Sequence, residues 1–428
     1  MLSQGGRNDS CKIAYRNPGA SEYAFAQSAV GRGNICGPFC QRRCPFGRVA
    51  IRVLRYDFAD DPLRFRPYHR RFRAGAAFRG KPRKSTDGVH RYSPSLHDAC
   101  HASVMTEIRS VCVVGAGAIG SLFAGHLGSV VDAKVLVRRK EHETVLNRDG
   151  LRVSGKSALQ TSVQASTDPT KLGRVDLVII ATKASAVEEA AEQLTGHFPN
   201  AIVMTVQNGL GCEDVVARYG QWPIISSITF MSGTRHSDSH VEYELDTETW
   251  LGPWPAGSAH TGTANVVADL ITRSGLKAKA FADVRPAQWS KLIFNSVVNS
   301  VGAVTNLPHL KAFAKRERIS DLGNLVFEMM QEGKAVAEAQ GIELYEDPWE
   351  MNVKAVSHGA TGQDAYAHVF SMLSDVRARR ATEIDWLTGA IVRQATALGV
   401  PVPIHEALFG LVKGLEHSWK EQKGHKVL

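Results

Sequence analysis

A six-residue glycine motif, Gly115-Ala116-Gly117-Ala118-Ile119-Gly120, restricts the possible folds of this chain more than any other feature. It follows an apolar run at 108–114 and opens a helix-like stretch at 118–127. In that context the first glycine permits a tight turn, the second lets the backbone approach a pyrophosphate, and the third allows close helix packing. The free N–H groups and the positive dipole end of the helix then bind phosphate. The motif therefore predicts a dinucleotide site at Gly115, Gly117, Ala118, Ile119 and Gly120.

Apolar runs and helical stretches alternate from this motif to about residue 283. The runs that end in polar residues lie at 133–139, 175–183, 201–209 and 223–230. Strands that alternate with helices form a parallel sheet covered on both faces. Beyond about Asp283 only helical patterns remain, at 286–304, 319–340, 382–398 and 404–419. We expect an α/β chain: a dinucleotide-binding Rossmann-type domain at 105–283, followed by an all-helical substrate and catalytic domain at 284–428.

The end of the second predicted strand indicates which dinucleotide is bound. Enzymes that use NAD usually have Asp or Glu there, which accepts hydrogen bonds from the ribose 2′-hydroxyl group. Here the run ends Val137-Arg138-Arg139-Lys140. An acidic residue would repel a 2′-phosphate, whereas Arg can bind it through two hydrogen bonds. The sequence predicts NADP(H), with Arg138 as the main contact, and leaves Arg139 and Lys140 open as a solvated turn.

Polar residues at the carboxyl ends of two predicted strands are candidates for ligand binding. Lys183 ends the run at 175–183, and Asn208 ends the run at 201–209. In an open parallel sheet, ligands bind beyond these ends. Lys183 and Asn208 can therefore hold a nicotinamide ribose and a substrate carboxylate. A solvent-facing loop lysine and an Asn-Gly turn are the structural alternatives.

The first predicted helix of the second domain carries a polar stripe. Lys291, Asn295 and Asn299 recur every four residues between apolar neighbours, which places them on one helix face. Reduction of a ketone produces an alkoxide that needs a proton, and a partly desolvated lysine can supply it. We therefore interpret Lys291 as a general acid and the two asparagines as orienting groups, with a structural hydrogen-bond network between the domains as the alternative.

Residues 1–104 differ in composition from the rest of the chain. They contain 19 Lys and Arg against 7 Asp and Glu, a net charge of +12, whereas the remainder has 32 and 35, a net charge of −3. They show no regular period, which predicts a disordered or non-native extension before a functional start at Met105. A transit peptide and a basic nucleic-acid tail are the alternatives. Cys36, Cys40 and Cys44 lack zinc-site spacing, so we expect no metal.

From 108 to 420 the chain resembles the ketopantoate reductase (2-dehydropantoate 2-reductase) family. The resemblance lies in GAGAIG, Arg138, ATK at 181–183, QNG at 207–209, WSKLIFNSVVN at 289–299 and SMLSDVRARRATEIDW at 371–386. It implies that Lys291 is the catalytic acid and that Lys183, Asn208, Asn295 and Asn299 contact the substrate or nicotinamide. It also implies that Ser371 binds the substrate carboxylate and that Glu383 binds its distal hydroxyl group. Ser300 departs from the family, which often has Asn-Pro at 299–300.

The resemblance implies NADPH-dependent reduction of ketopantoate to pantoate, within pantothenate and coenzyme A biosynthesis. A reductase of another small 2-keto acid, an opine-type dehydrogenase and a non-catalytic NADP-binding sensor are the alternatives. We expect a small-molecule substrate, no nucleic-acid or membrane partner, and a cytoplasmic location, with a homodimer left open. The absence of a secretion signal and of long apolar stretches favours this location.

Overall fold

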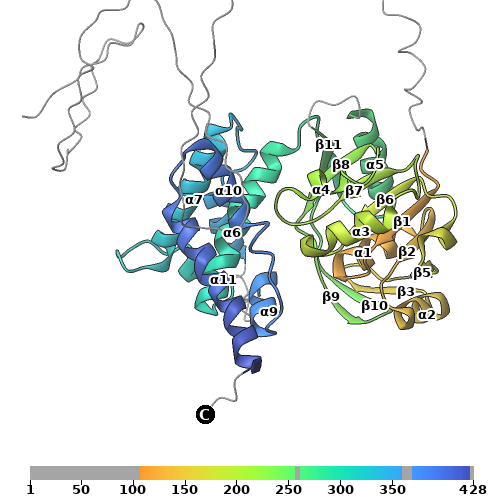
Figure 1. Ribbon diagram of the computed structural model, residues 1–428, viewed down its shortest axis with the longest axis horizontal. Coiled ribbons are helices and arrows are strands. Elements are labelled where there is room, and N and C mark those ends of the chain that lie inside the picture. Colours follow the sequence, from red (N-terminus) through yellow and green to blue (C-terminus); the bar gives the residue numbers. More distant parts are fainter. Residues whose placement is uncertain (1–106, 256–260, 359–368, 425–428) are drawn as a thin grey trace, which may run out of the picture. The chain divides into compact units, whose positions relative to one another are not determined.

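The structure is a computed structural model, and it describes residues 107–255, 261–358 and 369–424 (Figure 1). The extension at 1–104, with Cys36, Cys40 and Cys44, lies outside the described residues, so its interpretation stays a prediction. None of the helices in the described ranges is both long and apolar enough to cross a membrane.

The first part of the described chain contains an eight-stranded sheet in the order β12-β11-β8-β7-β6-β1-β2-β5. Its strands are β1 (Ser110–Val114), β2 (Asp132–Leu136), β5 (Gln164–Ser166), β6 (Leu177–Ile180), β7 (Ile202–Thr205), β8 (Ile224–Thr229), β11 (Thr249–Trp254) and β12 (Ala278–Ala280). Neighbouring strands are parallel except for the antiparallel pair β8 and β11. The predicted Rossmann-type parallel sheet is confirmed, with an antiparallel step near one edge.

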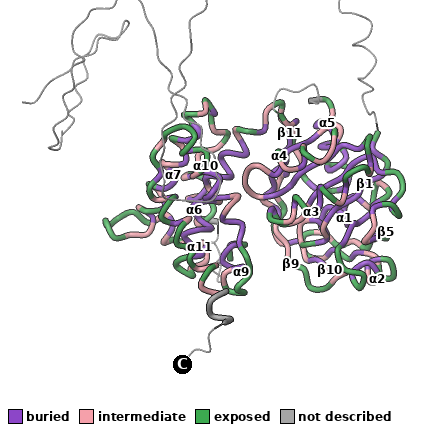
Figure 2. Tube along the Cα trace, viewed as in Figure 1, coloured by how far each residue is buried: buried purple, intermediate pink, exposed green. Residues whose placement is uncertain are grey.

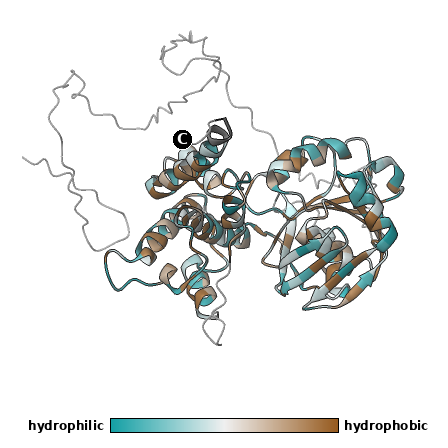
Figure 3. Cartoon of the chain, turned by 90° about the horizontal axis from the view of Figure 1, so that it is seen from below, coloured by the Kyte–Doolittle hydropathy of each residue, from teal (hydrophilic) through white to brown (hydrophobic). Residues whose placement is uncertain are grey.

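The strands of this sheet form because their residues are apolar on both faces. β1 and β6 are buried along their whole length, and helices flank the sheet (Figure 2). The associated helices are α1 (Ala118–Leu127), α2 (Lys140–Asp149), α3 (Val187–Leu194), α4 (Cys212–Val216) and α5 (Thr261–Arg273). Hydrophilic residues gather on the outer helices, as Figure 3 shows. Strand β2 ends at Leu136, earlier than predicted, so Arg138 lies in the connection to α2.

A second, four-stranded sheet has the order β4-β3-β10-β9. Its strands are β3 (Leu151–Gly155), β4 (Leu159–Thr161), β9 (Ser232–Ser237) and β10 (His240–Leu245). The segment after Thr229 is therefore an antiparallel ribbon that pairs with β3. Its charged residues, which include Arg235 and Glu242, lie on a half-solvated sheet separate from the one that carries the glycine motif.

In the described ranges beyond β12, the longer elements are all helices, as predicted. They are α6 (Arg285–Thr305), α7 (Leu322–Ala339), α8 (Pro348–His358), α9 (Ser371–Arg377), α10 (Thr388–Leu398) and α11 (Pro403–Gly424). α6 packs against α7, α8, α9, α10 and α11 and forms the centre of this apolar core (Figure 1). The helix predicted at 382–398 begins only at Thr388, because residues 383–387 form turns that end in a sharp bend at Leu387.

Candidate functional site

The glycine motif forms the turn between β1 and α1. Gly115 has a φ of +93°, and a Cβ there would lie 2.9 Å from Thr182 Cγ2. Gly120 packs so tightly that a Cβ would lie 1.9 Å from the carbonyl oxygen of Gly115. Gly117 is exposed, and a Cβ there would meet nothing within 4 Å. The structure thus gives the three glycines distinct surroundings: a left-handed turn, an open approach and a close helix contact.

The surroundings of this turn fit a dinucleotide. Ala118 and Ile119 begin α1, and no acidic side chain in the first turn offsets the positive end of the helix dipole. The Thr182 hydroxyl, beside Gly115, is buried without a hydrogen-bond partner in the described part of the chain. The Arg138 side chain is 76% exposed, and its nearest carboxylate is that of Glu189, 3.9 Å away. The open space at Gly117, the positive end of α1 and the exposed guanidinium group of Arg138 are therefore suited to a phosphorylated ligand.

Lys291 is buried where α6 meets the ends of β7 and β8. Its Nζ donates a hydrogen bond of 2.8 Å to Asn208 Oδ1 and another to the carbonyl oxygen of Thr229. The ring of Phe230 lies 4.9 Å from Nζ. Burial lowers the pKa of Lys291 to about 7, although the negative charge of Glu383 opposes this shift. An amine with this pKa can donate a proton near neutral pH.

Lys183 and Glu383 also lie close together. Lys183 Nζ is 3.9 Å from Glu383 Oε2, and it donates a hydrogen bond of 2.7 Å to Asp375 Oδ2. Glu383 Oε1 accepts a hydrogen bond of 3.0 Å from the backbone N–H of Ala184. Glu383 is buried in the turn before α10, whereas Lys183 follows β6 and is half-exposed. The carboxylate is thus held by the backbone at the end of a sheet strand.

The two asparagines of α6 have different surroundings. Asn299 is buried, and its Oδ1 accepts hydrogen bonds from the N–H of Met372 at 3.2 Å and from the hydroxyl of Ser371 at 3.4 Å. It therefore fixes the start of α9, where Ser371 is exposed. Asn295 is half-buried, and its side chain makes no hydrogen bond with the described residues. Asn295 is therefore available to a ligand, whereas Asn299 holds the segment that carries Ser371.

Ser371 and Glu383 lie on different elements: Ser371 begins α9, and Glu383 lies in the turn before α10. α9 ends at Arg377, so the two residues do not share a helix. Ser300, at the departure from the family pattern, donates its hydroxyl to the carbonyl oxygens of Ser296 and Val297 within α6. It therefore leaves the helix continuous.

Two contacts of the site were missed by the sequence analysis. Asp375 is buried and bonded to Lys183 from 192 residues away, and Phe230 contacts Lys291. Asp375 stands inside the quoted segment 371–386, four residues after Ser371, so the helical spacing of the pair was a usable signal. No local pattern distinguishes Phe230 from a core aromatic residue.

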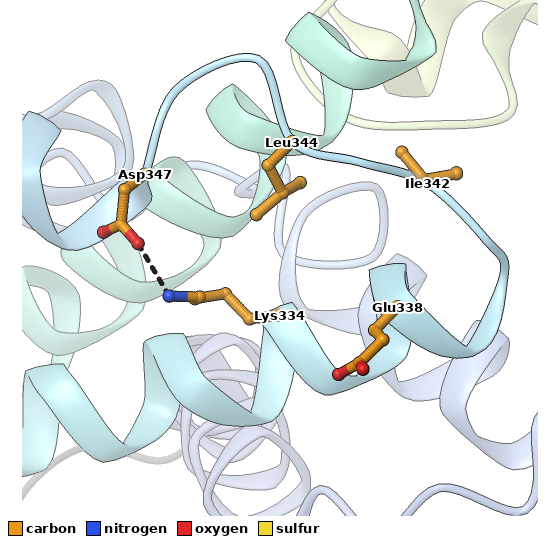
Figure 4. Close-up of a pocket in the computed structure, with 5 residues that line it drawn as sticks. All are labelled: Lys334, Glu338, Ile342, Leu344 and Asp347. Atoms are coloured by element: carbon orange, nitrogen blue, oxygen red, sulfur yellow. Dashed lines mark hydrogen bonds and ion pairs between the residues drawn. The ribbon is translucent and has the colours of Figure 1, made fainter. Parts of the chain in front are cut away.

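A hollow of about 280 Å³ lies away from these groups, between α7 and the segment before α8 (Figure 4). It is lined by Lys334, Glu338, Ile342, Leu344 and Asp347. Lys334 and Asp347, two of its lining residues, form an ion pair of 2.6 Å, so their charges neutralise each other. The hollow therefore adds no reactive group to the candidate site.

The fold and the site define a class of protein: an oxidoreductase with a dinucleotide-binding α/β part and a helical part that carries a buried lysine. The family model "Ketopantoate reductase PanE/ApbA" matches residues 111–256, and "Ketopantoate reductase PanE/ApbA C terminal" matches residues 283–416. The chain belongs to the ketopantoate reductase family. Membership indicates a nicotinamide cofactor and a small keto acid substrate.

Several known proteins are similar over nearly their full length. The 2-dehydropantoate 2-reductase of Pyrococcus abyssi is 28% identical over 72% of this chain and 97% of its own. The enzyme of the same name from Vibrio cholerae is 26% identical over 73% and 99%. The structure of a ketopantoate reductase from Ralstonia eutropha covers 73% of this chain and 99% of its own, at 25% identity and a TM-score of 0.64. A D-mandelate dehydrogenase with NADH and anilino(oxo)acetate covers the same shares at 22% identity and a TM-score of 0.64.

Proposed function

We propose that this protein reduces 2-dehydropantoate (ketopantoate) to pantoate with NADPH, a step of pantothenate and coenzyme A biosynthesis. The single observation that carries the proposal is the buried Lys291, whose pKa is lowered to about 7 and which lies within hydrogen-bond distance of Asn208. The relatives named 2-dehydropantoate 2-reductase support the choice of substrate. The bound cofactor supplies the hydride that reduces the carbonyl carbon.

Lys291 provides the proton in this proposal. The reduced carbonyl oxygen needs a proton, and a protonated Nζ can donate it. The hydrogen bonds to Asn208 Oδ1 and to the carbonyl oxygen of Thr229 fix the position of Nζ. Because Lys291 is buried, its proton is held weakly enough to be transferred near pH 7.

The remaining site residues bind and orient the substrate. Ser371 is exposed at the start of α9, where its hydroxyl can donate to the substrate carboxylate. Glu383 Oε1 is held by the N–H of Ala184, which leaves Oε2 to accept a hydrogen bond from the distal hydroxyl group of ketopantoate. Lys183, Asn208, Asn295 and Asn299 would complete the contacts to substrate and nicotinamide. A keto acid without the distal hydroxyl group would leave Oε2 of Glu383 without this hydrogen bond.

The preference for NADPH rests on Arg138, which is exposed in the connection between β2 and α2. In Arg138→Asp the Michaelis constant for NADPH should rise far more than that for NADH, because Asp repels a 2′-phosphate but accepts from a 2′-hydroxyl group. Arg139→Asp is the matched control, since Arg139 already pairs with Asp238 at 2.7 Å. Steady-state kinetics with both cofactors measure the difference, and equal rises for NADPH and NADH would refute this role.

The substrate is tested by following NADPH oxidation at 340 nm with ketopantoate, 2-ketoisovalerate and pyruvate in parallel. The proposal expects a much higher kcat/KM for ketopantoate, because only this compound has the hydroxyl group for Glu383. A preference for another keto acid would make the protein a sister reductase on the same scaffold. Turnover of none of them would contradict reduction of small keto acids and favour a sensor that binds NADP without catalysis.

A second candidate is a reductase of a different 2-keto acid. It is favoured by the D-mandelate dehydrogenase, whose fold matches this chain as well as that of the Ralstonia eutropha reductase does. That protein is described with NADH, so the cofactor comparison above also separates the two candidates.

A further inference from the structure

Lys183 faces two carboxylates but bonds to only one of them. Its Nζ lies 2.7 Å from Asp375 Oδ2, which is a charge-assisted hydrogen bond, and 3.9 Å from Glu383 Oε2, which is not. The lysine side chain is half-exposed, and oxygens of both carboxylates lie near its Nζ. The observed choice of Asp375 therefore calls for a physical reason.

The carboxylate of Asp375 is buried and held in place by Arg380. Its side chain is only 4% exposed, and its Oδ1 accepts hydrogen bonds from Arg380 Nε at 3.1 Å and Nη2 at 3.0 Å. The N–H of Arg380 also bonds to the Asp375 carbonyl oxygen at 2.9 Å, which closes the turn after α9. Arg380 thus fixes the carboxylate with Oδ2 directed to Lys183. Breaking the pair would leave a buried carboxylate with one partner fewer, which is costly.

One carboxylate oxygen of Glu383, Oε1, accepts a hydrogen bond from the backbone, whereas Oε2 lies 3.9 Å from Lys183 Nζ. The N–H of Ala184 holds Oε1, and Ala184 directly follows Lys183 in the chain. The Lys183 side chain therefore starts within short reach of Oε2. The negative charge of Glu383 also favours the protonated form of Lys291 and raises the pKa of the Cys212 thiol. An ion pair between Lys183 and Glu383 would weaken this influence on both groups.

We propose that Asp375 is a positioning residue that holds Lys183 away from Glu383 Oε2 and so leaves this oxygen free for the distal hydroxyl group of the substrate. The identity of that substrate rests on the proposed function, whereas the competition of two carboxylates for Lys183 does not. In this proposal Asp375 acts through Lys183, its hydrogen-bond partner at 2.7 Å.

The first test is the kinetics of Asp375→Asn with two substrates. Asn keeps the shape of Asp, but it binds Lys183 more weakly because it has no charge. The KM for ketopantoate should rise roughly tenfold, equivalent to about 1.4 kcal/mol. The KM for 2-ketoisovalerate should rise several-fold less than that for ketopantoate, because displacement of Lys183 affects both substrates whereas the covered oxygen of Glu383 affects only the substrate with a distal hydroxyl group. Equal losses for both substrates would indicate general distortion and overturn the proposal.

The pH profile of the same variant gives an independent readout. The titratable and charged groups that face Glu383 or its partners are Lys183, Lys291, Asp375, Arg380 and the neutral thiol of Cys212. If Lys183 neutralises Glu383, the pKa of Lys291 falls further. The high-pH limb of kcat/KM should then move to lower pH by about half a unit or more. An unmoved limb would contradict the pairing of Lys183 with Glu383.

Two further variants distinguish a positioning role of Asp375 from a general effect on the structure. In a Lys183→Met background, Asp375→Asn should change the residual selectivity for ketopantoate less than about twofold, because no lysine remains to cover Glu383. Asp385→Asn is the matched control: Asp385 lies two residues after Glu383 and pairs with Lys413 at 2.9 Å, without contact to Lys183. Full additivity of the Lys183 and Asp375 changes would overturn the proposal.

A crystal structure of Asp375→Asn tests the inference without any assay. Lys183 Nζ should leave the substituted side chain and approach Glu383 Oε2 to about 2.8 Å. If Nζ stays beyond hydrogen-bond distance from Glu383, the inference is wrong even in an active enzyme. If the wild-type protein does not reduce ketopantoate but the lysine moves as expected, the proposed function fails and the competition between the carboxylates stands.

Discussion

At the scale of single residues, the chemistry depends on how far Lys291 is withdrawn from water. Nζ is enclosed by α6, Phe230 and the ends of two strands, and its hydrogen-bond partners, Asn208 and the carbonyl oxygen of Thr229, are both uncharged. Neutral partners satisfy the amine but do not restore its usual basicity. Burial is the larger effect and lowers the pKa to about 7, while the negative charge of Glu383 opposes the shift.

Replacing Lys291 tests this role directly. Lys291→Ala should lower kcat by roughly two orders of magnitude or more, as expected for the loss of a general acid. Lys277→Ala is the control, because Lys277 is exposed and pairs only with Asp246. Stopped-flow and steady-state rates measure the effect, with thermal unfolding as a check on folding. A near-normal kcat would assign the proton donor to another group.

The pH dependence of the reaction follows from the same residue. Lys291 must be protonated to donate, so kcat/KM for reduction should be high below pH 7 and should fall as the pH rises through about 7. The limb of kcat should lie at higher pH than that of kcat/KM, because the bound substrate carboxylate favours the ammonium form. Lys291→Ala should lose this limb. A limb unchanged in the variant would show that another group titrates.

At the scale of elements, two glycines of the turn between β1 and α1 differ in what requires them: Gly120 is needed for the fold, whereas Gly117 is predicted to serve ligand binding. Gly120 is required by packing, since a Cβ would lie 1.9 Å from the carbonyl oxygen of Gly115. Gly117 faces open space and has a φ of −74°, which other residues adopt easily. Packing within the protein therefore does not require a glycine at this position, in agreement with the predicted approach of a pyrophosphate.

Alanine at these two positions should have opposite consequences. Gly117→Ala should change the free energy of unfolding by less than about 1 kcal/mol, yet raise the KM for NADPH roughly tenfold, equivalent to about 1.4 kcal/mol. Gly120→Ala should instead destabilise the protein by about 1–3 kcal/mol through overpacking. Chemical denaturation and cofactor titration distinguish the two effects. Unchanged NADPH binding in a folded Gly117→Ala protein would contradict the phosphate site.

At the scale of the whole molecule, the α/β part and the helical part both contribute candidate site residues. Lys183 and Asn208 follow sheet strands, whereas Lys291, Ser371 and Glu383 come from the helical part. The two family matches, at 111–256 and 283–416, lie entirely within the region that begins after Met105. The basic segment before Met105 contributes none of the candidate site residues.

A chain that begins at Met105 should therefore fold and keep the kcat and KM of the full chain within about twofold, because all site residues and both family matches are retained. Circular dichroism, thermal unfolding and the 340 nm assay measure this. Loss of folding or activity would give the first hundred residues a structural role. Salt-sensitive nucleic-acid binding by the full chain alone would instead support a basic tail.

The sequence by itself determined the features that depend on neighbouring residues. The glycine turn, the buried strands, the change to helices after about residue 283 and the Lys291–Asn299 face of α6 all follow from local periodicity and backbone preference. The second sheet was not predicted, because its short, half-exposed strands pair across distant segments. Tertiary structure alone decided that Lys183 bonds to Asp375, 192 residues away, and that burial lowers the pKa of Lys291. Such contacts depend on how the elements pack in space, and no local pattern records that packing.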